Sequence, residues 1–273
     1  MWQPEKNLFC KFRFRPRRKM ITTVSGQFRS RLKGQGQEFH SLRPYEFGDE
    51  AKKIDWKHYA KTDELAVRED VAERNMRIWI AQDISRSMEF GSKPTLVDGF
   101  FSFAKYLTND GGNSVGIMTV SNKLHFLRKP KAGVQTRCAP TPQVDTGELS
   151  LSCVSKLFSE YTRSEDIVFL ISDFFSTENL EQHIRPFSLN QELIPVVIRD
   201  PREKMPVSNA RISFRDMETG HYLEVLGKTG LESYDISLKE TFNRLFLDFL
   251  WIEGKDYNEA IQAILEWLYQ RSR

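Results

Sequence analysis

The sequence predicts a three-layer α/β fold with a mostly parallel central sheet. From residue 76 onward, short apolar runs alternate with segments of helical periodicity, which is the pattern of strands connected by helices. Two of the apolar runs, at residues 77–82 and 166–172, lead directly to an aspartate. Buried strands that each end on an acid are expected where a parallel sheet carries a ligand site at its carboxyl edge.

The elements follow from this alternation. Leu96, Phe100, Phe103 and Leu107 repeat at helical spacing. The loop at 129–147 contains three prolines, residues 216–220 link two short strands as a hairpin, and an amphipathic helix from Tyr257 closes the chain. We expect strands at 77–82, 115–120, 124–127, 166–172 and 193–198, and helices at 94–108, 148–161 and 178–188.

Composition narrows the class of protein. The chain has 273 residues, of which 40% are hydrophobic, so it can fill a sizeable core. Its net charge of +3 does not indicate a general polyanion binder. Three scattered cysteines form neither a disulfide framework nor a zinc pattern, and no segment approaches the roughly 18 apolar residues of a membrane span. We expect a cytoplasmic protein.

An N-terminal accessory segment, residues 1–72, differs in amino-acid composition from the main domain at 73–273 and lacks a long helical pattern. Phe9, Phe12 and Phe14 interleave with Lys11, Arg13 and Arg15 in a basic stretch that continues to Lys19. This pattern is typical either of an arm packed on the body or of a surface that stacks single-stranded nucleic acid. Gly34 and Gly36 lack the Lys and Ser or Thr of a phosphate loop, so we exclude a nucleotide site there.

Asp83, Ser85 and Ser87 stand at alternating positions where the first strand of the main domain should end. Such hard oxygen donors can converge on Mg²⁺ or Mn²⁺. The same residue types also make turn and helix-cap hydrogen bonds without any metal, and the three residues alone do not decide between these interpretations. The second acid-terminated strand, which ends at Asp173, favours the metal site.

Several motifs resemble a known family. Asp83-x-Ser85-x-Ser87 resembles the metal-ion-dependent adhesion site (MIDAS) of von Willebrand factor A domains. The motifs before it, in this order, resemble the signature of bacterial DUF58 proteins: Gly34-x-Gly36-x-Glu38-Phe39, Leu42-Arg43-x-Tyr45, Gly48-Asp49, Ile54-Asp55-Trp56 and Leu65-x-Val67-Arg68-Glu69. The resemblance is dense over residues 25–92 and looser beyond.

The resemblance implies a Rossmann-like von Willebrand factor A-type domain, a metal-assisted protein-interaction role and a MoxR-type AAA+ ATPase as partner. It assigns Asp83, Ser85 and Ser87 to the first metal loop and Asp173 to the third. The second loop usually has a Gly-Thr pair, which is absent between 129 and 148. Thr136, Thr141 and Thr146 are the candidates, and we choose Thr146 because it is nearest the expected helix. We assign Arg86 and Met88 to partner contact.

We therefore predict a non-enzymatic module that binds Mg²⁺ or Mn²⁺ and a protein partner, in chaperone-like assembly or activation of a complex. A metal-dependent phosphohydrolase is an alternative, but haloacid-type phosphatases need an acid where Ser85 stands, and the five histidines show no catalytic spacing. Nucleic-acid binding through the basic aromatic stretch is the other alternative, although no recognition signature supports it.

For Arg43, Asp49, Asp55 and Trp56 two roles are open. They could form a second functional surface beside the metal site. We favour internal ion-pair and helix-cap roles, because Arg–carboxylate pairing is a common fastening device, and we expect Trp56 to be a core residue.

Overall fold

The chain forms two compact units, residues 21–75 and residues 1–20 together with 76–273. From the sequence we expected residues 1–72 to form one accessory segment. The observed division differs, because residues 1–20 belong to the larger unit. The computed structural model describes residues 9, 14, 37–49, 51–72, 76–109, 113–132, 148–176, 178–204, 212–215, 222–225 and 231–272.

The smaller unit is built on a two-stranded antiparallel sheet, with a short helix in the connection. Asp55 caps this helix by accepting the backbone N–H groups of Lys57 and His58, both at 3.0 Å. Arg43 pairs with Asp49 through two hydrogen bonds, of 2.5 and 2.8 Å. The elements of the smaller unit are β1 (Gln37–Pro44), the 3-10 helix η1 (Ala51–Lys53), α2 (Trp56–Thr62) and β2 (Ala66–Ala72).

The contacts of Arg43, Asp49 and Asp55 are therefore internal to the smaller unit and agree with the fastening role that we favoured. The expectation for Trp56 was wrong. Its side chain is 59% exposed, and its ring meets that of Tyr59 edge-on, with centroids 6.2 Å apart. Trp56 is the first residue of a helix that has no buried residue, which explains why an apolar side chain did not become core.

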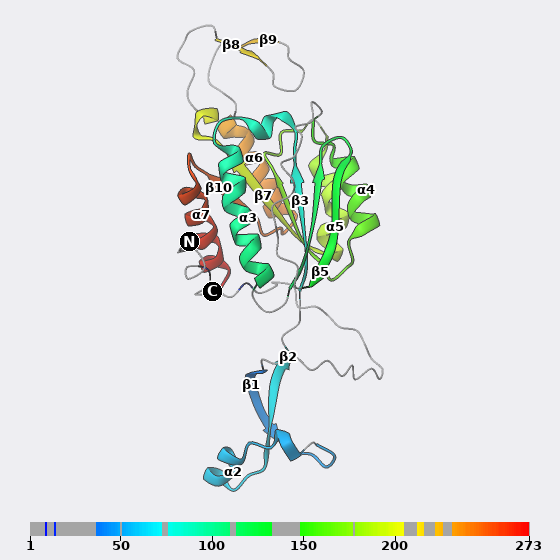
Figure 1. Ribbon diagram of the computed structural model, residues 1–273, viewed down its shortest axis with the longest axis vertical. Coiled ribbons are helices and arrows are strands. Elements are labelled where there is room, and N and C mark those ends of the chain that lie inside the picture. Colours follow the sequence, from blue (N-terminus) through cyan, green and yellow to red (C-terminus); the bar gives the residue numbers. More distant parts are fainter. Residues whose placement is uncertain are drawn as a thin grey trace. The chain divides into compact units, whose positions relative to one another are not determined.

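A six-stranded sheet forms the centre of the larger unit (Figure 1). The strands are parallel except for the antiparallel edge strand β5. The first strand of the unit, β3, lies inside the sheet, and the chain builds outward from it on both sides. In sheet order the strands are β10 (Leu250–Glu253), β7 (Glu192–Arg199), β6 (Ile167–Ser172), β3 (Arg77–Asp83), β4 (Ser114–Val120) and β5 (Leu124–Ala132).

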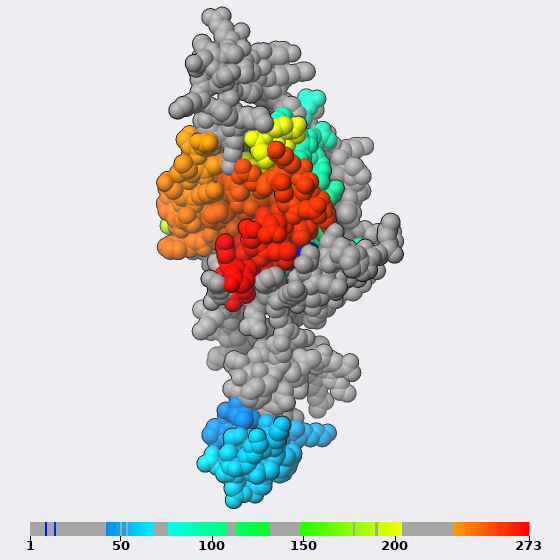
Figure 2. Space-filling view, turned by 90° about the vertical axis from the view of Figure 1, so that its left-hand side faces the viewer, coloured from blue at the N-terminus to red at the C-terminus, as the bar shows by residue number. Residues whose placement is uncertain are grey.

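Helices cover both faces of this sheet and complete three layers (Figure 1). The helices α3 (Lys93–Asn109) and α7 (Tyr257–Arg271) pack side by side on one face. The other face carries α4 (Leu151–Tyr161), α5 (Leu180–Asn190) and α6 (Leu231–Arg244). Figure 2 shows the C-terminal elements, coloured orange to red, as one continuous surface. The remaining elements are the 3-10 helices η2 (Arg86–Glu89) and η3 (Pro201–Lys204) and the hairpin β8 (Ile212–Arg215) with β9 (Tyr222–Val225).

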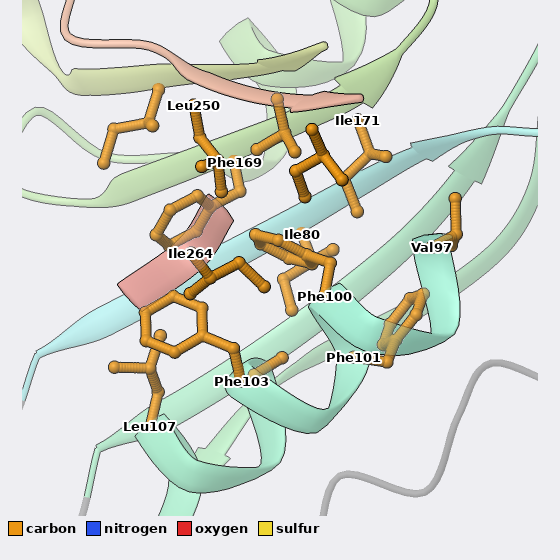
Figure 3. Close-up of a cluster of buried hydrophobic side chains, with 14 of the residues drawn as sticks. Ile80, Val97, Phe100, Phe101, Phe103, Leu107, Phe169, Ile171, Leu250 and Ile264 are labelled. Atoms are coloured by element: carbon orange, nitrogen blue, oxygen red, sulfur yellow. The ribbon is translucent and has the colours of Figure 1, made fainter. Parts of the chain in front are cut away.

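Two apolar clusters fill the space between the layers, because successive side chains of a strand point to opposite faces. Ile78 and Ile80 of β3 belong to the cluster under α3 and α7, whereas Trp79 and Ala81 belong to the opposite one. Figure 3 shows Phe100 and Phe103 of α3 beside Ile80, Phe169 and Ile264 in the first cluster.

The start of the chain contributes to the first cluster. Phe9 is 1% exposed and packs on Phe103 and Tyr106, and Phe14 is 5% exposed and stacks on Trp267. Two rings of the N-terminal stretch are therefore core residues, which favours the packed arm over a base-stacking surface.

The three-layer fold with its mostly parallel sheet is confirmed, with two differences in the elements. Strand β5 continues to Ala132, so residues 129–132 are strand rather than the expected loop. Helix α6 and strand β10 were not predicted, although Leu238 and Phe242 of α6 keep helical spacing. The expected turn of the β8–β9 hairpin, at 216–220, lies outside the described residues. In the described part of the chain, every helix is too short or too polar to cross a bilayer.

Candidate metal centre at the carboxyl edge of the sheet

Two aspartates follow neighbouring strands at the centre of the sheet. Asp83 is the last residue of β3, and Asp173 comes directly after β6. The two strands pair in parallel with Gln82 opposite Ile171, so both acids lie at the same edge. From β3 the strand order runs to β4 on one side and to β6 on the other, which makes this edge the switch point at which open α/β sheets bind ligands.

Asp83 is fully buried, and hydrogen bonds hold both of its carboxylate oxygens. Oδ1 accepts the backbone N–H of Ser85 at 2.8 Å, and Oδ2 accepts the hydroxyl of Ser172 at 2.7 Å. Burial, and then the negative charge of Asp173, raise the pKa of Asp83 to about 7, against the lowering effect of the serine hydrogen bonds. A carboxylate held beside another carboxylate in a buried place favours a cation as neighbour.

The two serines of the motif turn their hydroxyls toward each other. Ser85 is the N-cap residue of η2 by position, but its side chain makes no capping hydrogen bond. Its Oγ lies 3.1 Å from Oγ of Ser87 instead. The bond from the Ser85 N–H to Asp83 is ordinary turn chemistry, whereas the paired hydroxyls are not explained by a helix cap.

Asp173 is held by a strained piece of backbone. The next residue, Phe174, has φ of +57°, a left-handed conformation that is uncommon for a bulky side chain. Its ring is 2% exposed and packs on Phe242, and its backbone N–H binds the Ser172 hydroxyl at 2.8 Å. These contacts hold the strained turn, and strain of this kind clusters at functional sites.

Lys93 brings a buried cation to the same place, which the sequence did not predict. The side chain is 0% exposed, and Nζ lies 2.8 Å from Oδ2 of Asp173 and 2.7 Å from Oε1 of Glu203. It also donates to the carbonyl oxygen of Ser87 at 3.2 Å. One signal was present in the sequence, because a lysine at the first residue of a helix opposes the helix dipole and needs a specific acceptor.

The end of β7 adds a second buried cation. Arg199 is 0% exposed, donates from Nε to Asp235 at 2.9 Å and also binds the backbone carbonyl of Asp173. The next residue, Asp200, accepts the backbone N–H of Ser92 at 2.6 Å and the hydroxyl of Ser92 at 2.8 Å. The Arg202 guanidinium holds the pKa of Asp200 well below its usual range. These contacts fix the loop that leads into α3, the helix that begins at Lys93.

The structure therefore brings four of the predicted site residues, Asp83, Ser85, Ser87 and Asp173, to one edge of the sheet. Thr146, the choice for the second loop, lies outside the described residues. The two predicted partner contacts differ from each other. Arg86 is exposed, but Met88 is 6% exposed within the apolar cluster under α3. Met88 must be corrected to a core residue, because its side chain is covered by the protein itself.

The donors at this edge fit a hard divalent cation. One carboxylate and two hydroxyls, from Asp83, Ser85 and Ser87, are oxygen ligands of the kind that Mg²⁺ and Mn²⁺ take. Within the described ranges, no three His, Cys, Asp or Glu side chains form a group that could hold a metal. A cation here would therefore depend on hydroxyls and water, with Asp173 already engaged by Lys93.

Comparison with known proteins places the chain in a family. The family model described as "Protein of unknown function DUF58" matches residues 41–233. An uncharacterized protein of Mycobacterium tuberculosis is 25% identical over 240 residues, which cover 84% of this chain and 73% of the relative, and an uncharacterized protein of Mycobacterium bovis matches equally.

Solved structures with similar folds include BatB from Bacteroides thetaiotaomicron, at 13% identity and a TM-score of 0.47 over 71% of this chain and 98% of that one. The ArnB paralog VWA2 from Sulfolobus acidocaldarius has 15% identity and a TM-score of 0.40 over 70% of this chain and 44% of that one. The family model covers more than half of the chain, and the larger unit has the expected three-layer architecture. The chain therefore belongs to the DUF58 family.

Proposed function

We propose that this protein is a non-enzymatic, metal-dependent protein-interaction module. The observation that carries the proposal is the meeting of Asp83, Ser85 and Ser87 at the switch point of the sheet, with the two hydroxyls 3.1 Å apart. Asp83, Ser85 and Ser87 would hold Mg²⁺ or Mn²⁺, and Thr146 remains the proposed ligand from the second loop.

Such a site selects its partner by charge. The three ligands of the first loop carry one negative charge between them, so a divalent cation held there keeps positive charge and open positions. A glutamate or aspartate of a partner protein would fill one of these positions, as hard cations prefer carboxylate oxygens. Arg86, exposed between the two serines, would add a second contact to an acidic surface.

The geometry favours binding over catalysis. Both oxygens of Asp83 accept hydrogen bonds, which restrains a nucleophilic role, and residue 85 offers a hydroxyl where haloacid-type phosphatases have a second acid. From the family resemblance we propose a MoxR-type AAA+ ATPase as the partner, with a role in chaperone-like assembly or activation of a third protein. ATP-driven release would suit an interaction that depends on a single metal bridge.

The first experiment is calorimetric titration of Mg²⁺ and of Mn²⁺ into chelator-stripped protein. We expect one saturable site that is lost in Asp83→Ala and kept in Glu165→Ala, which removes an exposed acid from the loop before β6. Binding to a MoxR-type AAA+ ATPase should then fail with chelator and in Asp83→Ala, while the circular dichroism spectrum is unchanged. Saturable binding that survives in Asp83→Ala, or partner binding that ignores the chelator, would refute the proposal.

A further inference from the structure

A lysine ammonium occupies the position beside the candidate metal centre. The Nζ of Lys93 has three N–H groups and three oxygen acceptors within 3.2 Å, on Asp173, Glu203 and Ser87. The ring of Phe175 lies on another side, with its centroid 5.5 Å from Nζ. Nothing is left for solvent, since the side chain is 0% exposed.

This burial is unusual and calls for a reason beyond stability. Lysine is almost never fully buried unless paired, and a buried ion pair often stabilises a fold no more than apolar residues would. The acceptors of Lys93 come from three separate loops at the carboxyl edge: Ser87 after β3, Asp173 after β6 and Glu203 after β7. The ammonium thus joins the loops that carry the candidate ligands.

Two of the three contacts belong to candidate metal-site residues. Oδ2 of Asp173 is bound by Lys93, and its Oδ1 accepts the backbone N–H of Phe175 at 3.1 Å. The carbonyl of Ser87 faces Lys93, whereas the hydroxyl of Ser87 faces Ser85. A metal that Asp173 coordinates directly would compete with the ammonium for its carboxylate, and a metal bound by Asp83 and the serines would be repelled by the ammonium.

We propose that Lys93 is a resident cation of the site, which occupies Asp173 and thereby lowers the affinity of the free chain for a divalent metal. The inference rests on the proposed function and deepens it. An acidic side chain from the partner replaces the negative charge that Lys93 has neutralised on Asp173. Metal and partner carboxylate then bind cooperatively, and each raises the affinity for the other by the same factor.

The inference is tested by removing the ammonium without leaving an extra buried charge. The double variant Lys93→Met with Glu203→Gln removes one positive and one negative charge, so the net charge of the protein is unchanged. Titration of Mn²⁺ into the chelator-stripped full chain should show binding about tenfold tighter than wild type, or more, because Asp173 becomes available and a repelling cation is gone. Asp83→Ala in the same background should abolish it.

Glu203→Gln alone is the matched control. It keeps Lys93 on Asp173 and removes a negative charge, so Mn²⁺ should bind no more tightly than to wild type. The single and double variants therefore differ in the direction of the effect, which a purely structural role of Lys93 does not predict. Should the double variant fail to fold, Lys93→Gln with Glu203→Gln provides the same comparison, because it keeps the net charge and the new side chain still donates a hydrogen bond, and it too must bind Mn²⁺ more tightly than wild type.

The outcomes separate the inference from the proposed function. A folded variant without the ammonium that binds Mn²⁺ with wild-type or weaker affinity overturns the inference, while saturable wild-type binding lost in Asp83→Ala keeps the proposed function. Absence of saturable binding in both the wild type and the variants overturns both. Binding that appears only after Lys93 is replaced supports the resident cation and refutes metal binding by the free wild-type chain.

Discussion

Replacing Asp83 by asparagine should make the metal-free protein more stable at alkaline pH. Burial and Asp173 raise the pKa of Asp83 from 3.8 to about 7, so in the folded protein the ionised form is unfavourable. At about 1.4 kcal/mol per pH unit, this difference corresponds to about 4 kcal/mol above pH 7. Asparagine removes the charge and keeps an oxygen that can accept the Ser85 N–H.

The sign of the pH dependence follows from linkage. Between about pH 4 and pH 7 the folded protein binds a proton at Asp83 that the unfolded chain has lost, so the wild-type free energy of unfolding falls as the pH rises through this window. The advantage of Asp83→Asn should therefore be largest at pH 8 and shrink to less than half at pH 5. Saturating Mg²⁺ should reduce it at pH 8, because a bound cation stabilises the ionised carboxylate.

Urea denaturation in the presence of EDTA, at pH 5 and at pH 8, measures the stability advantage of Asp83→Asn over wild type and its dependence on pH. Glu165→Gln is the control, since it neutralises an exposed acid and should change the free energy of unfolding by less than about 0.5 kcal/mol. If Asp83→Asn is less stable than wild type at pH 8, or if its advantage does not depend on pH, the electrostatic argument for a cation site loses its basis.

Two further predictions concern the framework that holds the site. Asp166→Ala should destabilise the fold by about 3 kcal/mol in urea denaturation, because it leaves the buried indole N–H of Trp79 and the guanidinium of Arg77 without their common acceptor, and equal midpoints for variant and wild type would contradict this. Phe14→Ala should cost about 3 kcal/mol by the same assay, because the ring is buried against Trp267, whereas an unchanged midpoint would mean that the N-terminal segment is not part of the core.

The stability cost at Asp83 and the strain at Phe174 have one explanation under the proposed function. A site that binds a cation needs carboxylates held close together before the cation arrives, and both burial and a left-handed backbone hold them there. Proteins tolerate such local costs at functional sites when the surrounding structure offsets them. Here the two apolar clusters on either side of the sheet supply that support.

Local pattern was sufficient for most of the larger unit. Helix α3 and strands β3, β4, β6 and β7 lie within two residues of their expected bounds, because periodicity and turn residues are properties of neighbouring positions. Strand β10 has only four residues, Leu250–Glu253, and it becomes a strand by pairing with the edge of β7, which a short apolar run does not reveal.

For the candidate site, the sequence alone determined that Asp83, Ser85, Ser87 and Asp173 lie at the ends of strands. A parallel sheet brings its strand ends to one edge, so their proximity followed from the fold class. Only the tertiary structure decided that Met88 turns into the core, because which side of a short 3-10 helix is covered depends on packing against α3.

The role of Lys93 was likewise decided by tertiary structure alone. Its acceptors Asp173 and Glu203 stand 80 and 110 positions further along the chain, and nothing in the local sequence around Lys93 specifies them. The strand order places the three loops together, and the burial that follows removes water as a competing partner, so the ammonium must bind the carboxylates. Residue types are properties of the sequence, whereas the pairing of buried charges is a property of the fold.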